Sequence, residues 1–129
     1  MIRCLVLTHG QVGPSLVKVV ELILGPVEGL AAETNEGRSA KEMTDVVRAW
    51  LAVDPGAGAL ILIDDYGGSC ANAAQLAART DLPAVILSGV NLAMLLGFAT
   101  WREDLGLEEL AQRLVAKGRE AIARVGGAK

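Results

Sequence analysis

The chain has 129 residues, enough for one domain with its own core and too few for a second. Hydrophobic residues make up 52% of it and aromatic residues only 3%, so the core must consist mainly of aliphatic side chains. The formal net charge of −3 argues against nucleic acid as the main ligand, because domains that bind nucleic acid usually carry a basic surface. We therefore expect a single domain over residues 1–129.

Short apolar runs alternate along the chain with longer segments of helical period, a pattern typical of a βαβ fold. Strands are predicted at residues 2–7, 28–33, 59–63 and 83–88. Helices are predicted at 16–24, 39–53, 70–79 and 92–99, with a last one that includes Leu107, Leu110, Ala111 and Leu114. Ser39 and Glu42 have the spacing of a capping box at a helix start. Residues 121–125 either extend the last helix or form a short edge strand.

Four strands alternating with helices predict a doubly wound α/β fold, with a mainly parallel four-stranded sheet flanked by helices. Ligands of such sheets bind outside the carboxyl ends of the strands. That rule selects three segments for the chemistry, namely residues 8–10, 64–69 and 88–91.

His9 is the only histidine, and it directly follows the first predicted strand. The adjacent Gly10 permits a tight turn and a close approach by another molecule. One histidine, with no second histidine and no paired cysteines, makes a poor metal site, so we expect no bound metal. His9 is then a candidate nucleophile or acid–base group.

Two carboxylates, Asp64 and Asp65, end the third predicted strand, which should lie next to the first. One of them can cap the following helix, while the other can accept a hydrogen bond from the imidazole of His9. Such a bond fixes the tautomer and leaves the second ring nitrogen free to attack. Gly67, Gly68 and Ser69 then lead into a helix, whose free N–H groups can cap the chain locally or bind an anion.

Three stretches, residues 6–10, 63–69 and 88–95, resemble in order and spacing the signature motifs of mannose-family IIA proteins of the bacterial sugar phosphotransferase system. Residues 117–120 resemble a further stretch of that family near its C-terminus. The resemblance implies that His9 takes a phosphoryl group from the carrier protein HPr and passes it to a separate IIB protein. It implies that Asp64 holds the imidazole, while Gly67, Gly68 and Ser69 receive the phosphoryl oxygens. No cofactor is implied.

Two positions depart from that family, which often has proline where this chain has Cys70 and Ala93. Proline at a helix start merely presets φ, so we expect a loss of rigidity rather than of the reaction. Neither the sugar, nor the identity of the IIB partner, nor the choice between transport and regulation follows from the sequence.

Two other functions remain open at this stage. Asp64 and Asp65 could belong to a receiver domain phosphorylated on aspartate, although residues 8–10 lack the acidic metal ligands that receivers carry after the first strand. A non-catalytic flavodoxin-like binding module is the other alternative, although few aromatic residues are available to stack on a flavin.

The two cysteines form no disulfide framework, and no apolar run approaches the roughly 20 residues that span a bilayer. With no signal-peptide pattern at the start, we expect a cytoplasmic protein without membrane insertion. Residues 92–99 are apolar on nearly every helical face, which indicates either an interface in a homodimer or a helix buried within its own subunit. The family resemblance favours the homodimer.

Overall fold

The computed structural model describes residues 1–54, 56–79 and 83–128. Its four strands form one parallel sheet in the order β2-β1-β3-β4. The elements follow the chain as β1 Arg3–Thr8, α1 Val12–Leu24, β2 Leu30–Thr34, α2 Ala40–Val53, β3 Ala59–Ile63, α3 Ser69–Ala77, β4 Ala84–Ser88, α4 Leu92–Trp101 and α5 Leu107–Glu120. The predicted doubly wound α/β fold is therefore confirmed.

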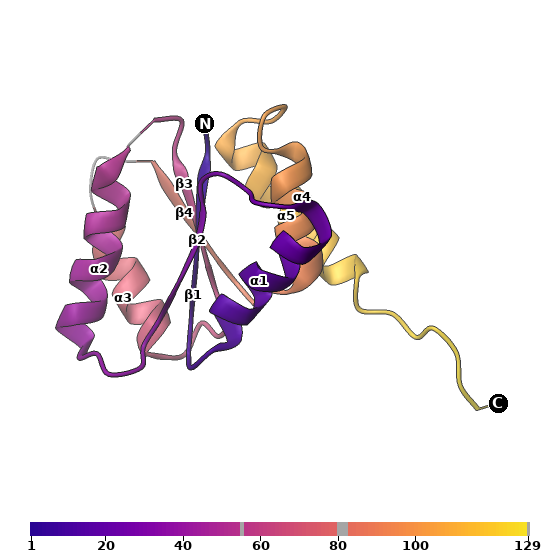
Figure 1. Ribbon diagram of the computed structural model, residues 1–129, viewed down its shortest axis with the longest axis horizontal. Helices are drawn as coiled ribbons and strands as arrows, with labels where there is room; N and C mark the ends of the chain where they lie inside the picture. The colour runs from indigo at the N-terminus through magenta and orange to yellow at the C-terminus, as the bar shows by residue number, and fades with distance from the viewer. Residues whose placement is uncertain (55, 80–82, 129) are drawn as a thin grey trace.

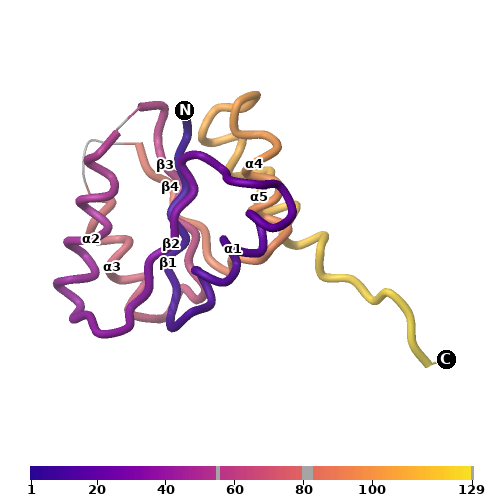
Figure 2. The backbone as a smooth tube through the Cα atoms, viewed as in Figure 1, coloured from indigo at the N-terminus to yellow at the C-terminus, as the bar shows by residue number. Residues whose placement is uncertain are grey.

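Helices cover both faces of the sheet, with α2 and α3 on one face and α1, α4 and α5 on the other (Figure 1). The backbone tube shows the same three layers (Figure 2). Alternate residues of the central strand β1 enter the two cores: Cys4 and Val6 pack on the α1 side, whereas Leu5 and Leu7 pack on the α2 side. In the described part of the chain, no helix is both long enough and apolar enough to cross a bilayer.

Most predicted elements lie within two residues of their observed bounds, and the capping box is confirmed. Ser39 Oγ accepts from the Glu42 backbone N–H, while the Glu42 carboxylate accepts from that of Ser39. The prediction for the first helix was wrong, because α1 begins at Val12 rather than at residue 16. Pro14 is tolerated in the first turn, where backbone N–H groups have no partner within the helix.

The buried Thr8 hydroxyl explains the early start of α1. Its Oγ1 accepts a hydrogen bond of 2.6 Å from the N–H of Gly13. A Cβ on Gly13 would lie only 2.9 Å from that oxygen, so glycine permits the close approach of helix to strand. The start of α1 is thus tied to the strand that carries His9.

We expect Thr8→Val to lower the free energy of unfolding by about 1–3 kcal/mol, because the Gly13 N–H would lose its acceptor inside the protein. Chemical denaturation would measure the change. Thr44→Val is the matched control, since Thr44 Oγ1 only donates to the Ala40 carbonyl of its own helix. Equal losses in the two variants would contradict the proposed role of Thr8.

The apolar segment expected to be exposed is instead covered by its own chain. Met94, Leu95 and Phe98 of α4 are buried in the core, and α4 packs against α1 and α5. These three side chains are therefore buried within their own subunit and do not supply the expected dimer interface, whereas the homodimer itself stays a prediction.

The described residues that follow α5 form neither a helix nor a strand beyond a turn at Ala121. Neither a continuation of α5 to residue 125 nor an edge strand is present in this described segment. Residues 122–128 instead extend away from the sheet (Figures 1 and 2).

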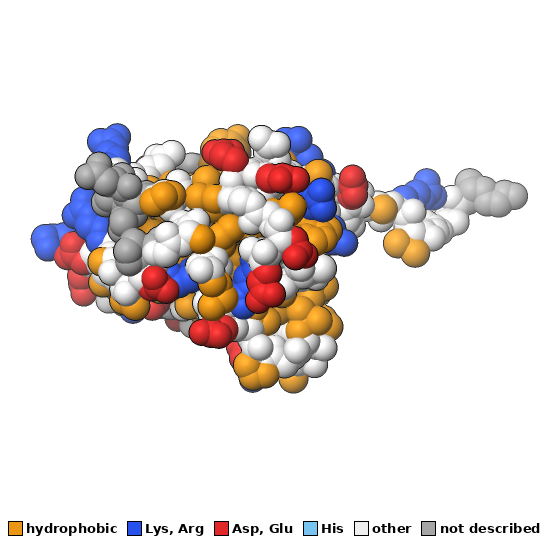
Figure 3. Space-filling view, turned by 90° about the horizontal axis from the view of Figure 1, so that it is seen from above, with side chains coloured by type: hydrophobic (Ala, Val, Ile, Leu, Met, Phe, Trp, Pro, Cys, Tyr) orange, Lys and Arg blue, Asp and Glu red, His pale blue; other side chains and the backbone are white. Residues whose placement is uncertain are grey.

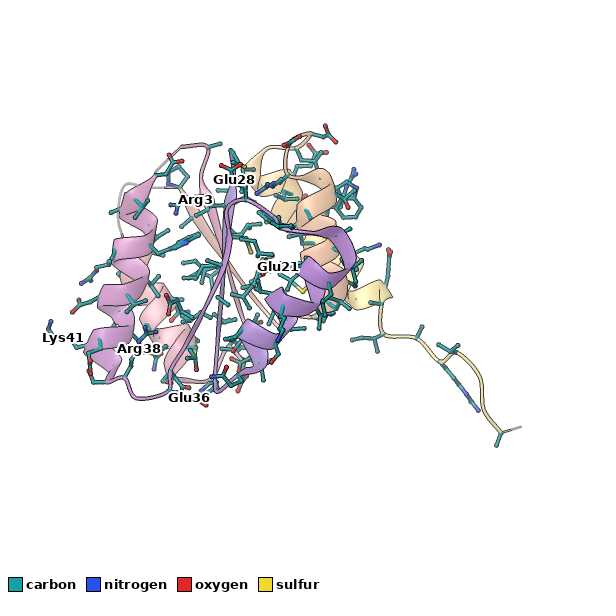
Figure 4. All side chains as sticks on the ribbon, viewed as in Figure 1. Arg3, Glu21, Glu28, Glu36, Arg38 and Lys41 are labelled. Atoms are coloured by element: carbon teal, nitrogen blue, oxygen red, sulfur yellow. The ribbon has the colours of Figure 1, made fainter. Side chains whose placement is uncertain are left out.

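The carboxyl ends of the strands face the lower end of the molecule, where Glu36 lies, whereas Arg3 at the start of β1 lies near the upper end (Figure 4). Seen from above, the upper end carries acidic and basic side chains that are intermixed (Figure 3). The segments selected for chemistry follow the strands at the lower end.

Candidate phosphoryl-acceptor site

Adjacent strands bring His9 and Asp64 together. β1 and β3 are parallel neighbours, with Leu7 opposite Ile63, so the residues that follow them emerge side by side. His9 Nδ1 lies 3.0 Å from Asp64 Oδ2 and 3.2 Å from Oδ1. The backbone N–H of His9 also donates to Asp64 Oδ2 over 3.0 Å. One carboxylate thus holds both the backbone and the ring of His9.

The two neighbouring aspartates have different partners. Asp64 Oδ1 also accepts from the N–H of Asp65, over 3.0 Å. The carboxylate of Asp65 turns along its own loop and accepts from the N–H of Gly67, over 3.3 Å. The structure therefore brings Asp64 to His9 and leaves Asp65 in a local turn.

Two opposing effects act on the pKa of Asp64. Partial burial raises the pKa. Hydrogen bonds from the backbone and ring of His9, together with the charge of that ring, lower it, and their combined effect is the larger one. The net pKa lies below the ordinary value, so Asp64 is ionised at neutral pH. An ionised Asp64 can only accept hydrogen bonds, which favours the His9 tautomer with its proton on Nδ1 and a free lone pair on Nε2.

The start of α3 lies against that free nitrogen. A Cβ on Gly68 would lie 2.8 Å from His9 Cε1 and 3.1 Å from Nε2, so only glycine lets the ring adopt this position. Gly68 is also the N-cap residue of α3, and no side chain caps the helix there. The uncapped N–H groups of its first turn are available to an anion.

The other two predicted residues of this loop are more exposed. Gly67 has room for a Cβ, which would lie 3.8 Å from the Asp65 carboxylate. Ser69 is the first residue of α3 and is exposed. Both belong to the loop and helix start beside His9.

The third predicted segment has a structural role. Asn91 Oδ1 accepts from the N–H of Met94 and caps α4, while Asn91 Nδ2 donates to the carbonyl of Gly118 over 3.2 Å. Asn91, together with Ser88 and Gly89, also lines a cavity of about 430 Å³. His9 is not among the residues that line this cavity.

Sequence reasoning missed two neighbours of His9. Asn35, which follows β2, accepts from the N–H of Gly10 over 3.1 Å and so supports the turn after His9, where Gly10 has φ +55°. Cys70 lies in the first turn of α3, with its Sγ 4.0 Å from His9 Nδ1. The contact between Asn35 and Gly10 forms because β1 and β2 are parallel neighbours. No motif in the sequence indicated that contact.

Burial is the main cause that raises the pKa of the Cys70 thiol, to about 11, and the charge of Asp64 raises it further, although a hydrogen bond from Ser69 opposes them. The free thiol is therefore protonated at neutral pH and is not an activated nucleophile.

Comparisons with known proteins show the family to which the chain belongs. Residues 3–115 match the family model EIIA-man, described as the PTS system fructose IIA component. The mannose-specific EIIAB component of the phosphotransferase system from Escherichia coli strain K12 is 32% identical over 118 residues, which is 89% of this chain and 36% of that protein. A protein of the same name from Shigella flexneri matches equally well. The chain thus spans about a third of the length of these curated relatives.

Two solved structures share the fold. The phosphotransferase system component EIIA from Streptococcus agalactiae has a TM-score of 0.88 at 24% identity, covering 96% of this chain and 97% of that one. The mannose/sorbose-specific IIA subunit from Enterococcus faecalis has a TM-score of 0.78 at 22% identity, covering 98% and 96%. These two structures show the fold alone. The family model spans most of the sequence, and it establishes that the chain belongs to the mannose-type IIA family of the phosphotransferase system.

Proposed function

We propose that this protein is a cytoplasmic phosphoryl carrier that accepts phosphate from phospho-HPr on His9 and passes it to a separate IIB protein. The transfer would serve sugar uptake or its regulation. The observation that carries the proposal is the 3.0 Å contact between His9 Nδ1 and the Asp64 carboxylate, which leaves Nε2 as the acceptor.

In the proposed step, the lone pair of Nε2 forms a bond to phosphorus while the bond from phosphorus to the donor histidine breaks. The His9 ring gains positive charge, and Asp64 stabilises it through the proton that stays on Nδ1. N–H groups at the start of α3, together with Ser69, would bind the phosphoryl oxygens. Transfer to the IIB protein reverses these changes, and no bound cofactor takes part.

The direct test is incubation with HPr, enzyme I and phosphoenolpyruvate, followed by mass spectrometry of the labelled site. The label should be stable to base and labile to acid, as expected for phosphohistidine. An aspartyl phosphate would have the opposite stability to base and would support the receiver alternative instead.

We expect Gly68→Ala to slow phosphorylation by about 100-fold, because the added Cβ must displace the imidazole and such misplacement of reacting groups is costly. Rapid-quench transfer from phospho-HPr would measure the rate. Gly67→Ala is the control within the same loop, and its loss should be much smaller because its Cβ makes only ordinary contacts. A Gly68→Ala variant as fast as wild type would show that the helix start is not packed on the reacting ring.

We also propose that the protein is a homodimer. β4 lies at the edge of the sheet, and its side chains are only half-buried apart from the exposed Ser88. Beyond α5, Ile122 and Val125 are 82% and 99% exposed. A second copy would cover these apolar groups and the open edge of β4.

Light scattering at micromolar concentration should therefore give twice the 13.4 kDa chain mass. Removal of residues 121–129 should weaken the dimer, because Ile122 and Val125 would be lost. Replacing the exposed Glu103, in the turn between α4 and α5, with Gln is the control and should leave the mass unchanged. A wild-type mass of one chain would contradict the dimer.

A further inference from the structure

We propose that His9 Nδ1, the Asp64 carboxylate and Cys70 Sγ form a binding site for a thiophilic divalent cation, with Zn²⁺ the best fit. We further infer that the bound ion prevents phosphorylation of His9. This second statement rests on the proposed function, whereas the binding site does not.

The three ligand groups already lie close together. One ligand atom from each of His9, Asp64 and Cys70 lies within 4.8 Å of the other two. Nδ1 is 3.0 Å from the nearer carboxylate oxygen and 4.0 Å from Sγ. A tetrahedral Zn²⁺ ion with bonds of about 2.0–2.3 Å has ligand atoms about 3.3–3.7 Å apart. Small side-chain movements, outward for the oxygen and inward for the sulfur, would therefore produce this geometry.

The donor set favours zinc among the common divalent cations. An imidazole nitrogen, a carboxylate oxygen and a thiolate suit Zn²⁺, whereas Mg²⁺ and Ca²⁺ prefer oxygen ligands alone. Three protein ligands leave the fourth position for a solvent molecule. The chain has no second histidine and no paired cysteines, but α3 brings Cys70 to His9, and this contact is what the expectation of no metal lacked.

The surroundings allow an ion to enter and favour its charge. The side chains of His9 and Asp64 are 44% and 23% exposed, whereas Cys70 is buried. In the described part of the chain, no lysine or arginine forms an ion pair with Asp64. The negative charge of that carboxylate is therefore available to the cation.

Binding would change the protonation of two ligands. The Cys70 thiol releases its proton to solvent, and a His9 ring in the Nδ1–H tautomer transfers its proton from Nδ1 to Nε2 through solvent, while Asp64 is already ionised. One proton is thus released for each ion bound. With a proton on Nε2 and the metal on Nδ1, His9 has no lone pair left to attack phosphorus.

Cobalt provides a spectroscopic test of the site in the whole protein. Titration of metal-free protein with Co²⁺ should give one ion per chain, a thiolate-to-cobalt charge-transfer band and the intense visible bands of tetrahedral cobalt. Zn²⁺ should displace the cobalt, and Mg²⁺ should not. Absence of the charge-transfer band, or a stoichiometry well below one, would overturn the site.

Matched cysteine variants identify the ligand. Cys70→Ala should lose the charge-transfer band and bind Zn²⁺ at least roughly 100-fold more weakly, as measured by competition with a chelator. Cys4→Ala removes the other free cysteine, which is buried in the core. This variant should keep both the charge-transfer band and the zinc affinity of wild type. Cys70→Ser, which keeps the side-chain size, should behave like Cys70→Ala, and circular dichroism would verify that each variant is folded. Unchanged zinc affinity in both folded Cys70 variants would overturn the proposal.

The regulatory statement is tested by the ratio of phosphorylation rates with and without stoichiometric Zn²⁺. This ratio should fall strongly for wild type and for Cys4→Ala, and it should stay near one for Cys70→Ala. The Cys70→Ala variant also serves as the control for effects of zinc on HPr and enzyme I. Equal inhibition of all three proteins would overturn the regulatory role. If metal-free wild type were not phosphorylated at all, the proposed function would fail while the cobalt result still decided the metal site.

Discussion

His9→Ala should abolish phosphorylation by phosphoenolpyruvate, enzyme I and HPr. His9 is the only histidine in the chain, so no other imidazole can replace it. Its ring also faces the uncapped start of α3, where a phosphoryl group would be bound. Radiolabelling or intact-protein mass spectrometry would measure the loss, and wild type should gain one phosphoryl group per chain.

The imidazole is partly exposed, so its removal should leave the fold intact, as circular dichroism and thermal unfolding would verify. Labelling of the folded His9→Ala variant to the wild-type level would remove the central element of the proposed function. Loss of such a label in base would then indicate an acyl phosphate on a carboxylate, and peptide mass spectrometry would show whether it lies on Asp64 or Asp65.

The arrangement of strands was predictable because burial on both faces leaves a clear pattern. β3 consists of five consecutive apolar residues, all buried, and its bounds are those predicted from the sequence. The start of α2 was equally clear, since Ser39 and Glu42 carry a local capping signal. The start of α1 depends instead on a hydrogen bond between Thr8 and Gly13, a tertiary contact that hydrophobic periodicity does not contain.

The apolar character of α4 had two explanations, and periodicity does not choose between them. A helix that is apolar all round is buried either in its own chain or in an interface. Here α5 packs closely on it, since a Cβ on Gly97 would lie 3.0 Å from Leu114 Cδ2. The packing of α5 on α4 decides between the two explanations, because it shows that α4 is covered by its own chain.

Of the contacts that His9 makes, the one with Asp64 was predictable from the sequence and the one with Cys70 was not. Parallel strands end at the same edge, so His9 and Asp64 were expected to meet, and their side chains are in contact. Cys70 lies 61 residues from His9 along the chain, and its approach depends on how the Gly67–Gly68 turn directs α3. Nothing in the spacing of the two residues indicates that contact.

Asp64→Ala should slow phosphoryl transfer by about 10²- to 10⁴-fold, the usual range for a group that orients or assists a proton-carrying side chain. The variant loses the acceptor of both the Nδ1 proton and the backbone N–H of His9. Asp64→Asn keeps an acceptor oxygen but removes the charge, so its rate should lie between those of Asp64→Ala and wild type. Rapid-quench transfer from phospho-HPr would rank the three proteins.

Asp65→Ala is the matched control for this prediction, because the two carboxylates are adjacent in sequence but have different partners. Asp65 accepts only from the Gly67 N–H of its own loop, so its removal should reduce the rate far less than removal of Asp64. The pH profile adds a second criterion. The Asp64 pKa lies below the ordinary value of about 3.9, so its support of His9 should persist from neutral pH down to that value and disappear only as the pH falls through its own lower pKa. If Asp65→Ala were the slower variant, the carboxylate that orients His9 during transfer would be Asp65, and the contact of Asp64 with the ring would serve stability alone.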